Sequence, residues 1–363
     1  MKKVLVVFGT RPEAIKMCPV VLELSKREKF EVCVCVSGQH KQMLNQVLSV
    51  FGVKADYDLQ IMSKGQTLFD ITSKVLKGIS LVLEKCAPDI VLVHGDTSTA
   101  FAASLAAFYR GIPIGHVEAG LRSGDIEEPF PEEFNRRAIT LMSSLDFAPT
   151  QLSKELLINE GKENVFLTGN TVLDSFKYTL SKTYESPFLP LLEQKKVILF
   201  TMHRRENIGE PMKSVFSAVK RVAGEREDIC FLFPLHPNPK IRSIAKECLG
   251  NCMNVKTCEP LDVVDFHNIL SRCYFALSDS GGVQEEGVAL HKPVLVLRNK
   301  TERPEGLACG GLRLIGTDED EVYKNILLLL DDNEVYKQMS QTVNPFGDGN
   351  ASEKIVDIIE KEL

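Results

Sequence analysis

The alternation of short apolar strands with helices, which runs through the chain twice, most restricts how this sequence can fold. In the first block we expect strands over residues 4–8, 31–37, 89–93, 112–117, 146–150 and 164–169, and in the second over 197–201, 229–234, 254–258, 274–279, 293–297 and 312–316. Near-continuously apolar strands separated by helices are typical of parallel sheets covered on both faces. The sequence therefore predicts an α/β protein with two Rossmann-like domains.

The stretch over residues 181–196 separates the two blocks. It contains two prolines and shows no clean periodicity, which is typical of a linker. A chain of 363 residues suits two domains, since single domains mostly have roughly 100–200 residues. We therefore expect an N-terminal domain over residues 1–180 and a C-terminal domain over 181–363. The sequence leaves open which domain the last helix packs on.

Composition excludes several classes of protein. The net charge of −6 and pI of about 5.8 argue against a nucleic-acid partner. No segment approaches the roughly 18 consecutive apolar residues of a membrane span. The start, MKKVLVVFGT, leads into a turn rather than a cleavage site, so we expect a first strand and a cytoplasmic protein. The ten cysteines include no CxxC pair, which predicts reduced thiols and no metal site.

The unusual polar residues follow the expected strands. GTRPEAIK, HGDTST and EAGLRSG each leave a strand of the first block, and MHRREN and SDSGGVQEE each leave a strand of the second. Ligands of open α/β sheets bind at the carboxyl ends of strands. The pattern therefore predicts one site in a cleft between two domains whose strand ends face each other.

Arg11 stands at the start of a helix, just before Pro12. A cation is disfavoured at the positive end of a helix, and an anion held between the helix and Arg11 would resolve the conflict. Lys16 follows one turn later. The alternative is an arginine that extends into solvent.

The second block contains a glycine turn, Ser280-Gly281-Gly282, which opens a helix. Its backbone N–H groups suit a phosphate, and Glu286 in the first turns suits the hydroxyls of a ribose. A Gly-Gly turn is often only a turn, but its position favours a nucleotide site. No GxGxxG pattern or Walker loop is present, which disfavours NAD and phosphoryl transfer from ATP.

Further cations follow other strands of the second block. His203, with two arginines after it, and Arg303 could both meet a diphosphate. A basic surface loop explains the segment around His203 equally well. His236 gives a more ambiguous signal, because an ordinary histidine in a loop would also explain it.

Asp96, Glu118 and Glu132 are the candidate acid–base set. Crowded carboxylates raise one another's pKa values, so that one can hold a proton while another stays ionised. Each also has a structural explanation: Asp96 as a helix cap, Glu118 as a partner of Arg122, and Glu132 with Glu133 as acids that favour a helix N-terminus. Because phosphate-binding groups are also expected on the other domain, we favour the catalytic interpretation of these three acids over the structural one.

The motifs VFGTRPEAIKM, SGQHKQML, LVHGDTSTAFAASLAAFY, GHVEAGLRSG, PFPEEFNRR, TGNTVLDS, HRREN, SDSGGVQEE and TERPEG occur in order along almost the whole chain. In this the chain closely resembles the bacterial non-hydrolysing UDP-N-acetylglucosamine 2-epimerases. The resemblance implies a GT-B fold, a homodimer, no cofactor, and interconversion of UDP-N-acetylglucosamine and UDP-N-acetylmannosamine. The GTRPEAIKM stretch favours the non-hydrolysing branch over the hydrolysing one.

The resemblance also implies roles for individual residues. The catalytic groups would be Asp96, Glu118, Glu132 and His203; the UDP contacts would be Arg11, Lys16, Phe266 (beside the uracil), Ser280, Gly281, Gly282, Glu286 and Arg303. A second UDP-N-acetylglucosamine would act as an allosteric activator near Gln39, Gln42 and His236. The implied reaction is elimination of UDP to a 2-acetamidoglucal followed by re-addition, in the service of surface-polysaccharide synthesis.

Two alternatives stay open. PFPEEFNR and RNKTERPEG depart from the usual forms of these motifs, and enzymes for related UDP-acetamido sugars share much of the pattern. A UDP-sugar-dependent glycosyltransferase of the GT-B type would share the fold and the nucleotide site. It would need an acceptor pocket and no acids on opposite faces of the sugar.

Overall fold

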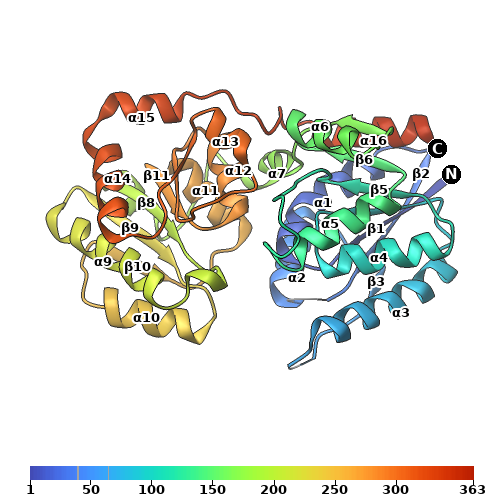
Figure 1. Ribbon diagram of the computed structural model, residues 1–363, viewed down its shortest axis with the longest axis horizontal. Coiled ribbons are helices and arrows are strands. Elements are labelled where there is room, and N and C mark those ends of the chain that lie inside the picture. The colour runs from blue at the N-terminus through green and yellow to red at the C-terminus, as the bar shows by residue number, and fades with distance from the viewer. Residues whose placement is uncertain (39–40, 64) are drawn as a thin grey trace. The chain divides into compact units, whose positions relative to one another are not determined.

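The computed structural model describes residues 1–38, 41–63 and 65–363, which form two compact units. Unit 1 comprises Met1–Tyr178 and Phe346–Leu363, and unit 2 comprises Thr179–Pro345. The two units are labelled by their elements in Figure 1. Within the described residues, no helix combines the length and apolar character needed to cross a membrane.

Unit 1 is built on a parallel sheet with the strand order β3-β2-β1-β4-β5-β6-β7. The strands are β1 (Lys2–Phe8), β2 (Phe30–Val36), β3 (Tyr57–Asp58), β4 (Ile90–His94), β5 (Ile114–Val117), β6 (Leu145–Ala148) and β7 (Val165–Leu167). The first, fourth and fifth strands are almost entirely buried because their side chains are apolar on both faces of the sheet.

The helices of unit 1 pack in two groups. They are α1 (Arg11–Ser25), α2 (Lys41–Phe51), α3 (Leu68–Cys86), α4 (Ser98–Tyr109), α5 (Glu132–Met142), α6 (Gln151–Asn159), α7 (Val172–Thr179) and α16 (Ala351–Glu362). Helices α3, α4 and α5 pack side by side, and α1 packs with α2 and α16. The chain adds strands on one side of β1 as far as β3 and on the other side from β4 onward. Right-handed crossovers that proceed to opposite sides place their helices on opposite faces of the sheet.

The last helix belongs to unit 1, although the segment before it belongs to unit 2 (Figure 1). The Asp174 carboxylate accepts hydrogen bonds from the backbone N–H groups of Ala351 (3.1 Å) and Ser352 (2.9 Å), which satisfies the start of α16. Arg27 pairs with Asp357 at 2.7 Å near the other end. These contacts attach α16 to α7 and to the segment that follows α1.

Unit 2 repeats the arrangement with the strand order β10-β9-β8-β11-β12-β13, again parallel. Its strands are β8 (Lys196–Thr201), β9 (Ile229–Pro234), β10 (Val255–Cys258), β11 (Phe275–Ser278), β12 (Val294–Val296) and β13 (Leu312–Leu314). Its helices are α8 (Leu189–Gln194), the 3₁₀ turn η1 (Arg205–Asn207), α9 (Glu210–Glu225), α10 (Pro239–Leu249), α11 (Val263–Arg272), α12 (Gly281–Ala289), α13 (Pro304–Ala308), α14 (Glu319–Asp331) and α15 (Asn333–Ser340).

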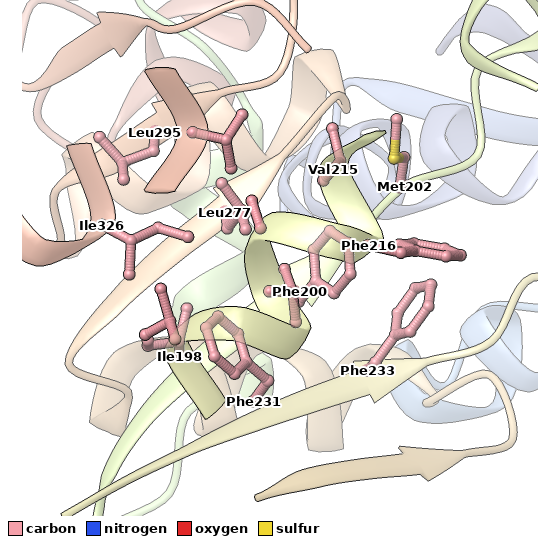
Figure 2. Close-up of a cluster of buried hydrophobic side chains, with 14 of the residues drawn as sticks. Ile198, Phe200, Met202, Val215, Phe216, Phe231, Phe233, Leu277, Leu295 and Ile326 are labelled. Carbon is pink, nitrogen blue, oxygen red and sulfur yellow. The ribbon is translucent and has the colours of Figure 1, made fainter. Parts of the chain in front are cut away.

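An aromatic cluster forms the centre of the unit 2 core (Figure 2). Phe200 on β8 lies 4.4 Å from Phe233 on β9, between ring centroids, and 5.8 Å from Phe216 on α9. All three side chains are fully buried. Met202, which is also buried in this cluster, directly precedes His203, so the core fixes the point at which the chain leaves β8.

Candidate functional site

The strand order reverses at one point in each sheet, and the polar residues singled out in the sequence gather there. The reversal falls between β1 and β4 in unit 1, and between β8 and β11 in unit 2. At such a point the chain leaves neighbouring strands in opposite directions, which opens the crevice where α/β proteins bind ligands. The residues that follow these strands are therefore the candidate site.

Asp96 follows β4 and is held by α5. Its carboxylate accepts a hydrogen bond from Arg136 at 2.5 Å, and its backbone carbonyl accepts one from Asn135 at 2.9 Å. The Arg136 side chain is only 5% exposed, whereas that of Asp96 is 25% exposed, so the cation lies behind the acid. Thr97, not Asp96, caps α4 by accepting a bond from the N–H of Ala100, so the helix-cap explanation of Asp96 is wrong.

Glu118 follows β5 with a left-handed backbone, at φ +62°. This conformation is uncommon for a residue other than glycine, and such strain is concentrated at functional sites. The Glu118 carboxylate forms an ion pair with Lys16, and both side chains are less than a tenth exposed. It also accepts a hydrogen bond from Asn170 at 3.1 Å, and Nε2 of His94 lies 3.7 Å away.

The suggested pairing of Glu118 with Arg122 is wrong. Arg122 instead donates two hydrogen bonds to Glu160, at 2.7 and 2.6 Å. Lys16, which the resemblance assigned to UDP, is the cation beside Glu118. A buried cation next to a carboxylate offsets the cost of burying its charge, and the two side chains then depend on each other.

Glu132 and Glu133 open α5 but differ in burial. Glu132 is half-buried, while Glu133 is fully buried. Glu133 accepts hydrogen bonds from the backbone N–H of Ser123 at 3.0 Å and from Arg137 at 2.8 Å. It therefore ties the loop after β5 to α5, which is more than the helix-terminus role expected from the sequence.

Segments that carry the three acids lie next to one another. A Cβ atom added at Gly95 would lie 3.7 Å from Oε1 of Glu118, so the Glu118 carboxylate lies beside the residue that precedes Asp96. Asn135, whose side chain contacts the Asp96 carbonyl, is one turn from Glu132 on α5. Unit 1 thus brings the segments of all three acids to the edge where β4 and β5 end.

Arg11 is the first residue of α1 and is half-buried. The helix begins with a capping box, in which Glu13 accepts a hydrogen bond from the Thr10 N–H at 2.7 Å. Glu13 also accepts one from the hydroxyl of Thr97 at 2.7 Å, and its burial raises its pKa. The start of α1 is therefore fixed to the start of α4, across the reversal of strand order.

In unit 2, Asp279 organises the chain after β8. This fully buried carboxylate accepts hydrogen bonds from the backbone N–H groups of His203 (3.0 Å) and Arg204 (2.9 Å) and from the Asn207 amide (3.0 Å). Nδ1 of His203 lies 3.5 Å from the same carboxylate, while its side chain is 40% exposed. Asp279 therefore holds His203 at the carboxyl end of β8 with the imidazole accessible.

The glycine turn opens α12 as predicted. Ser280 is the N-cap and Gly281 the first helical residue, and a Cβ atom there would lie 2.8 Å from the guanidinium of Arg303. Glycine is therefore required for Arg303 to approach this backbone. Gly282 is less crowded, because a Cβ atom added there would lie 3.6 Å from Oε1 of Glu286, in ordinary van der Waals contact.

Glu286 is buried beside α11. Its carboxylate lies 3.6 Å from Nε2 of His267, and Nδ1 of that histidine is 2.8 Å from the hydroxyl of Thr179. Phe266, the neighbour of His267, is half-buried. α11 therefore brings an aromatic ring and the histidine partner of Glu286 to the same side of α12.

Arg303 lies among acids. It donates to Glu285 at 2.8 Å and to Glu302 at 2.5 Å, and its side chain is 9% exposed. Glu302 also pairs with Arg298 (2.7 Å) and Arg204 (3.4 Å). Burial alone would raise the pKa of Glu302, but the three guanidinium groups outweigh it and hold that pKa well below its ordinary value.

The predicted allosteric residues are only partly described. Gln39 and the side chain of Gln42 lie outside the described part of the structure. The ring of His236 stacks on that of His203, with centroids 5.7 Å apart and planes 13° apart. His236 is thus a direct neighbour of the predicted catalytic histidine.

Within the described residues, no group of three or more His, Cys, Asp or Glu side chains could hold a metal ion. Among the candidate residues, unit 1 has carboxylates backed by cations, and unit 2 has cations backed by carboxylates.

Comparison with known proteins identifies the family. A family model described as UDP-N-acetylglucosamine 2-epimerase matches residues 22–360. The chain belongs to this family. It is 51% identical to the UDP-N-acetylglucosamine 2-epimerase of Bacillus subtilis, over 98% of this chain and 94% of the relative.

Two solved structures of the epimerase family are similar along their whole length. The S. aureus MnaA–UDP co-structure has a TM-score of 0.96 at 50% identity, covering 100% of this chain and 97% of that one. The Neisseria meningitidis UDP-GlcNAc 2-epimerase bound to UDP-GlcNAc has a TM-score of 0.94 at 46% identity, covering 99% and 100%. The predicted fold class, two Rossmann-like domains of the GT-B type, is confirmed, and so is the enzyme class, an isomerase.

Several residues that hold the candidate side chains in place were not predicted from the sequence of this epimerase-family chain. Arg136 and Asn170 in unit 1, and Asp279 and Glu302 in unit 2, each contact a predicted site residue or its loop. Asp279 offered a signal, since an acid at the end of an apolar strand is costly unless it is paired. Arg136 and Asn170 offered none, because only the tertiary fold brings them to their partners.

Proposed function

We propose that this protein interconverts UDP-N-acetylglucosamine and UDP-N-acetylmannosamine by inverting carbon 2 of the sugar. The observation that carries the proposal is the set of carboxylates at the carboxyl edge of unit 1, where Asp96 and Glu118 each have a buried cationic partner. Inversion requires one group to remove a proton from one face of the carbon and another to supply a proton on the opposite face. Asp96, Glu118 and Glu132 are the residues we assign to these transfers.

The nucleotide half of the substrate is assigned to unit 2. The N–H groups at the start of α12 suit a diphosphate, since Gly281 and Gly282 leave the backbone open to approach. Glu286 suits the ribose hydroxyls, and Phe266 the uracil. The relatives' structures, one described as a co-structure with UDP and one as bound to UDP-GlcNAc, support this assignment.

The hydrogen at carbon 2 is not adjacent to a carbonyl, so its direct removal faces a high barrier. We assign an elimination, in which a carboxylate takes this proton while the bond from carbon 1 to the UDP oxygen breaks. The electron pair of that bond leaves with UDP, and the C2–H pair forms the double bond of a 2-acetamidoglucal. Protonation of carbon 2 from the opposite face and return of UDP to carbon 1 complete the reaction. His203, Arg303 and Arg11 are the cations we assign to the departing diphosphate.

The decisive experiment is incubation with UDP-N-acetylglucosamine in D₂O, without an acceptor, followed by NMR. The expected result is UDP-N-acetylmannosamine with deuterium at carbon 2. Release of UDP with free N-acetylmannosamine would assign the protein to hydrolysis instead. An unchanged substrate would overturn the proposal. It would favour a glycosyltransferase, or a protein that binds the nucleotide sugar without acting on it. Running related UDP-acetamido sugars in parallel defines the sugar.

We also propose a homodimer. Large apolar side chains are exposed toward the C-terminal ends of the adjacent helices α3, α4 and α5: Leu81 (61%), Phe108 (56%), Tyr109 (71%) and Leu141 (85%). Exposed apolar patches of this kind mark protein interaction sites. Light scattering after size exclusion should give twice the mass of the 40.4 kDa chain, and a Leu141→Glu variant should give the monomer mass.

The last parts of the proposal concern regulation and cellular role. The stacking of His236 on His203 supports a second UDP-N-acetylglucosamine near Gln39, Gln42 and His236 that activates the enzyme. Sigmoidal rates for the wild type and hyperbolic rates for His236→Asn would support it. We assign the product to cytoplasmic synthesis of a surface polysaccharide, whose loss on deletion of the gene is the test.

A further inference from the structure

Two fully buried polar residues lie side by side in the sheet of unit 1, in a region that is otherwise apolar. His116 on β5 and Asp146 on β6 are partners in the strand register, and His116 is also the register partner of Val93 on β4. Both polar side chains are 0% exposed. Burying such groups is costly unless they are paired, so their presence in this sheet calls for a physical reason.

The contacts of His116 fix its tautomer. Its Nε2 lies 2.7 Å from the backbone carbonyl of Gly95, and a carbonyl can only accept, so Nε2 carries the proton. Its Nδ1 lies 3.7 Å from Oδ1 of Asp146, an electrostatic contact rather than a hydrogen bond.

Asp146 is held as an anion. Its carboxylate accepts a hydrogen bond from Ser143 at 2.7 Å and lies 3.3 Å from Nζ of Lys162. Burial alone would raise the pKa of Asp146, but His116, Ser143 and Lys162 outweigh it and lower that pKa. A buried chain of charges and dipoles therefore runs from Lys162 through Asp146 and His116 to the Gly95 carbonyl.

Gly95 links the exits of two strands. It has a left-handed backbone, at φ +63°, and directly precedes Asp96. Its N–H donates to the carbonyl of Val117 at 2.9 Å, and Val117 directly precedes Glu118. The backbone N–H and carbonyl of Gly95 are therefore both fixed. The N–H bonds to the last residue of β5, which Glu118 follows, and the carbonyl bonds to the imidazole of His116.

We propose that His116, through its bond to the Gly95 carbonyl, is a positioning residue for Asp96 and Glu118. This rests on the proposed function, because it assigns a kinetic role to the placement of two acids that transfer protons. Displacement of a catalytic group by about 1 Å can cost about 10²-fold in rate. Gly95 is free to adopt many backbone conformations, and the bond from His116 selects one of them.

The test compares two replacements of the same imidazole. His116→Phe fills the space without a donor, and His116→Gln keeps an N–H group near the position of Nε2. The matched control for lost packing is Val91→Ala. Val91 is a fully buried residue of β4, and none of the described hydrogen bonds joins it to Gly95. For each variant kcat is normalised to folded protein, measured by thermal unfolding and by the stoichiometry of UDP binding.

The expected result is a fall in kcat of about 10²-fold for His116→Phe with KM changed less than about threefold, and recovery to within about tenfold of wild type for His116→Gln. Val91→Ala should unfold at a lower temperature but keep the kcat of the folded protein. Equal kcat values for the Phe and Gln variants, or a fall in Val91→Ala as large as in His116→Phe, would overturn the proposal.

A second measurement does not depend on activity. Amide hydrogen exchange is followed in the peptides that contain Gly95 and Glu118. His116→Phe should speed exchange at the Gly95 amide by at least about tenfold beyond the change caused by global destabilisation, as measured on Val91→Ala, and His116→Gln should not. If the wild type does not epimerise its substrate, the proposed function fails, but hydrogen exchange still decides whether His116 fixes this segment. If exchange is unchanged in His116→Phe, the role of His116 is refuted and the proposed function is not affected.

Discussion

The two units use the same strand order at their carboxyl edges but arrange charge in opposite ways. In unit 1 an acid is presented and a cation lies behind it: Asp96 is 25% exposed, and its partner Arg136 5%. In unit 2 a basic group is presented and an acid lies behind it: His203 is 40% exposed, and Asp279 is fully buried.

This difference shows what determines the chemistry of such an edge. Backbone topology sets where the site lies, and both units have it at the reversal of strand order. The sign of the charge that faces a ligand is set by the buried partner, which compensates the presented group and fixes its geometry. We therefore expect substitutions of the buried partners to be as informative as those of the presented groups.

The largest effect is expected where the acid paired with Lys16 in unit 1 is neutralised. Glu118→Gln should lower kcat by about 10³-fold, since general acid–base groups contribute about 10²–10⁴-fold. UDP affinity, measured by calorimetry, should stay within about threefold because Glu118 is not among the residues assigned to UDP. Glu160→Gln, which breaks the pair with Arg122 on the same unit, is the control and should keep most of its activity. An active Glu118→Gln variant would remove Glu118 from the mechanism.

The next effect tests the buried acid of unit 2. Asp279→Ala should destabilise the protein by about 3 kcal/mol or more, because it leaves several buried donors without their acceptor. It should also weaken UDP binding, since the chain around His203 loses its geometry. Urea unfolding and calorimetry measure the two effects. The control is Asp320→Asn, which loses only an exposed contact with Arg221 and should leave stability and UDP binding unchanged. A stable Asp279→Ala variant would contradict the role of the buried acid.

A smaller effect, dependent on pH, is expected at Glu302. Its pKa is lower in the folded protein than the ordinary 4.5, so its ionised form adds stability above that pH. This contribution is lost as the pH falls toward the folded-state pKa. The stability difference between wild type and Glu302→Gln should therefore be largest at neutral pH and shrink on acidification below about pH 4.5. Urea unfolding from pH 7 to pH 3 measures it, and a difference that does not vary with pH would show that the charge of Glu302 is not responsible.

The smallest effect concerns an aromatic group rather than a charge. Phe266→Leu keeps the apolar volume of the half-buried ring but removes its stacking face. UDP affinity should fall about 3–10-fold, in line with the roughly 0.5–1.5 kcal/mol of an aromatic pair. The affinity for inorganic diphosphate should not change, because that ligand has no base. Equal losses for both ligands would mean that Phe266 acts on the fold of α11 instead.

Much of the fold follows from the sequence because parallel strands are read from runs of apolar residues. The run over residues 4–8 and the run over 229–234 both form strands close to their predicted bounds. The strand Tyr57–Asp58 was missed because two residues provide no period. The segment over residues 181–196, predicted as a linker, contains the short helix Leu189–Gln194.

Candidate site residues were predictable where they follow a strand, but their pairings were not. Asp96 and Glu118 stand at strand exits, where a polar residue is conspicuous in the sequence. Arg136 sits on a helix among other charged residues, and Lys16 was expected to bind an anion, so nothing in the local pattern marks either as the partner of these acids. Long-range pairing of this kind depends on which helix covers which strand end, and a single sequence leaves that open.

The attachment of α16 to unit 1 has a consequence for synthesis on the ribosome. Unit 2 is continuous in the chain and all its residues have been made before Phe346, whereas unit 1 lacks helix α16 until the whole of unit 2 has been made. Ile355, Val356 and Ile359 of α16 are fully buried, so the nascent first unit exposes an apolar surface in the meantime. The unit that begins first along the chain is therefore completed after its neighbour, and a frameshift within the codons for α16 would damage the unit that carries the acids.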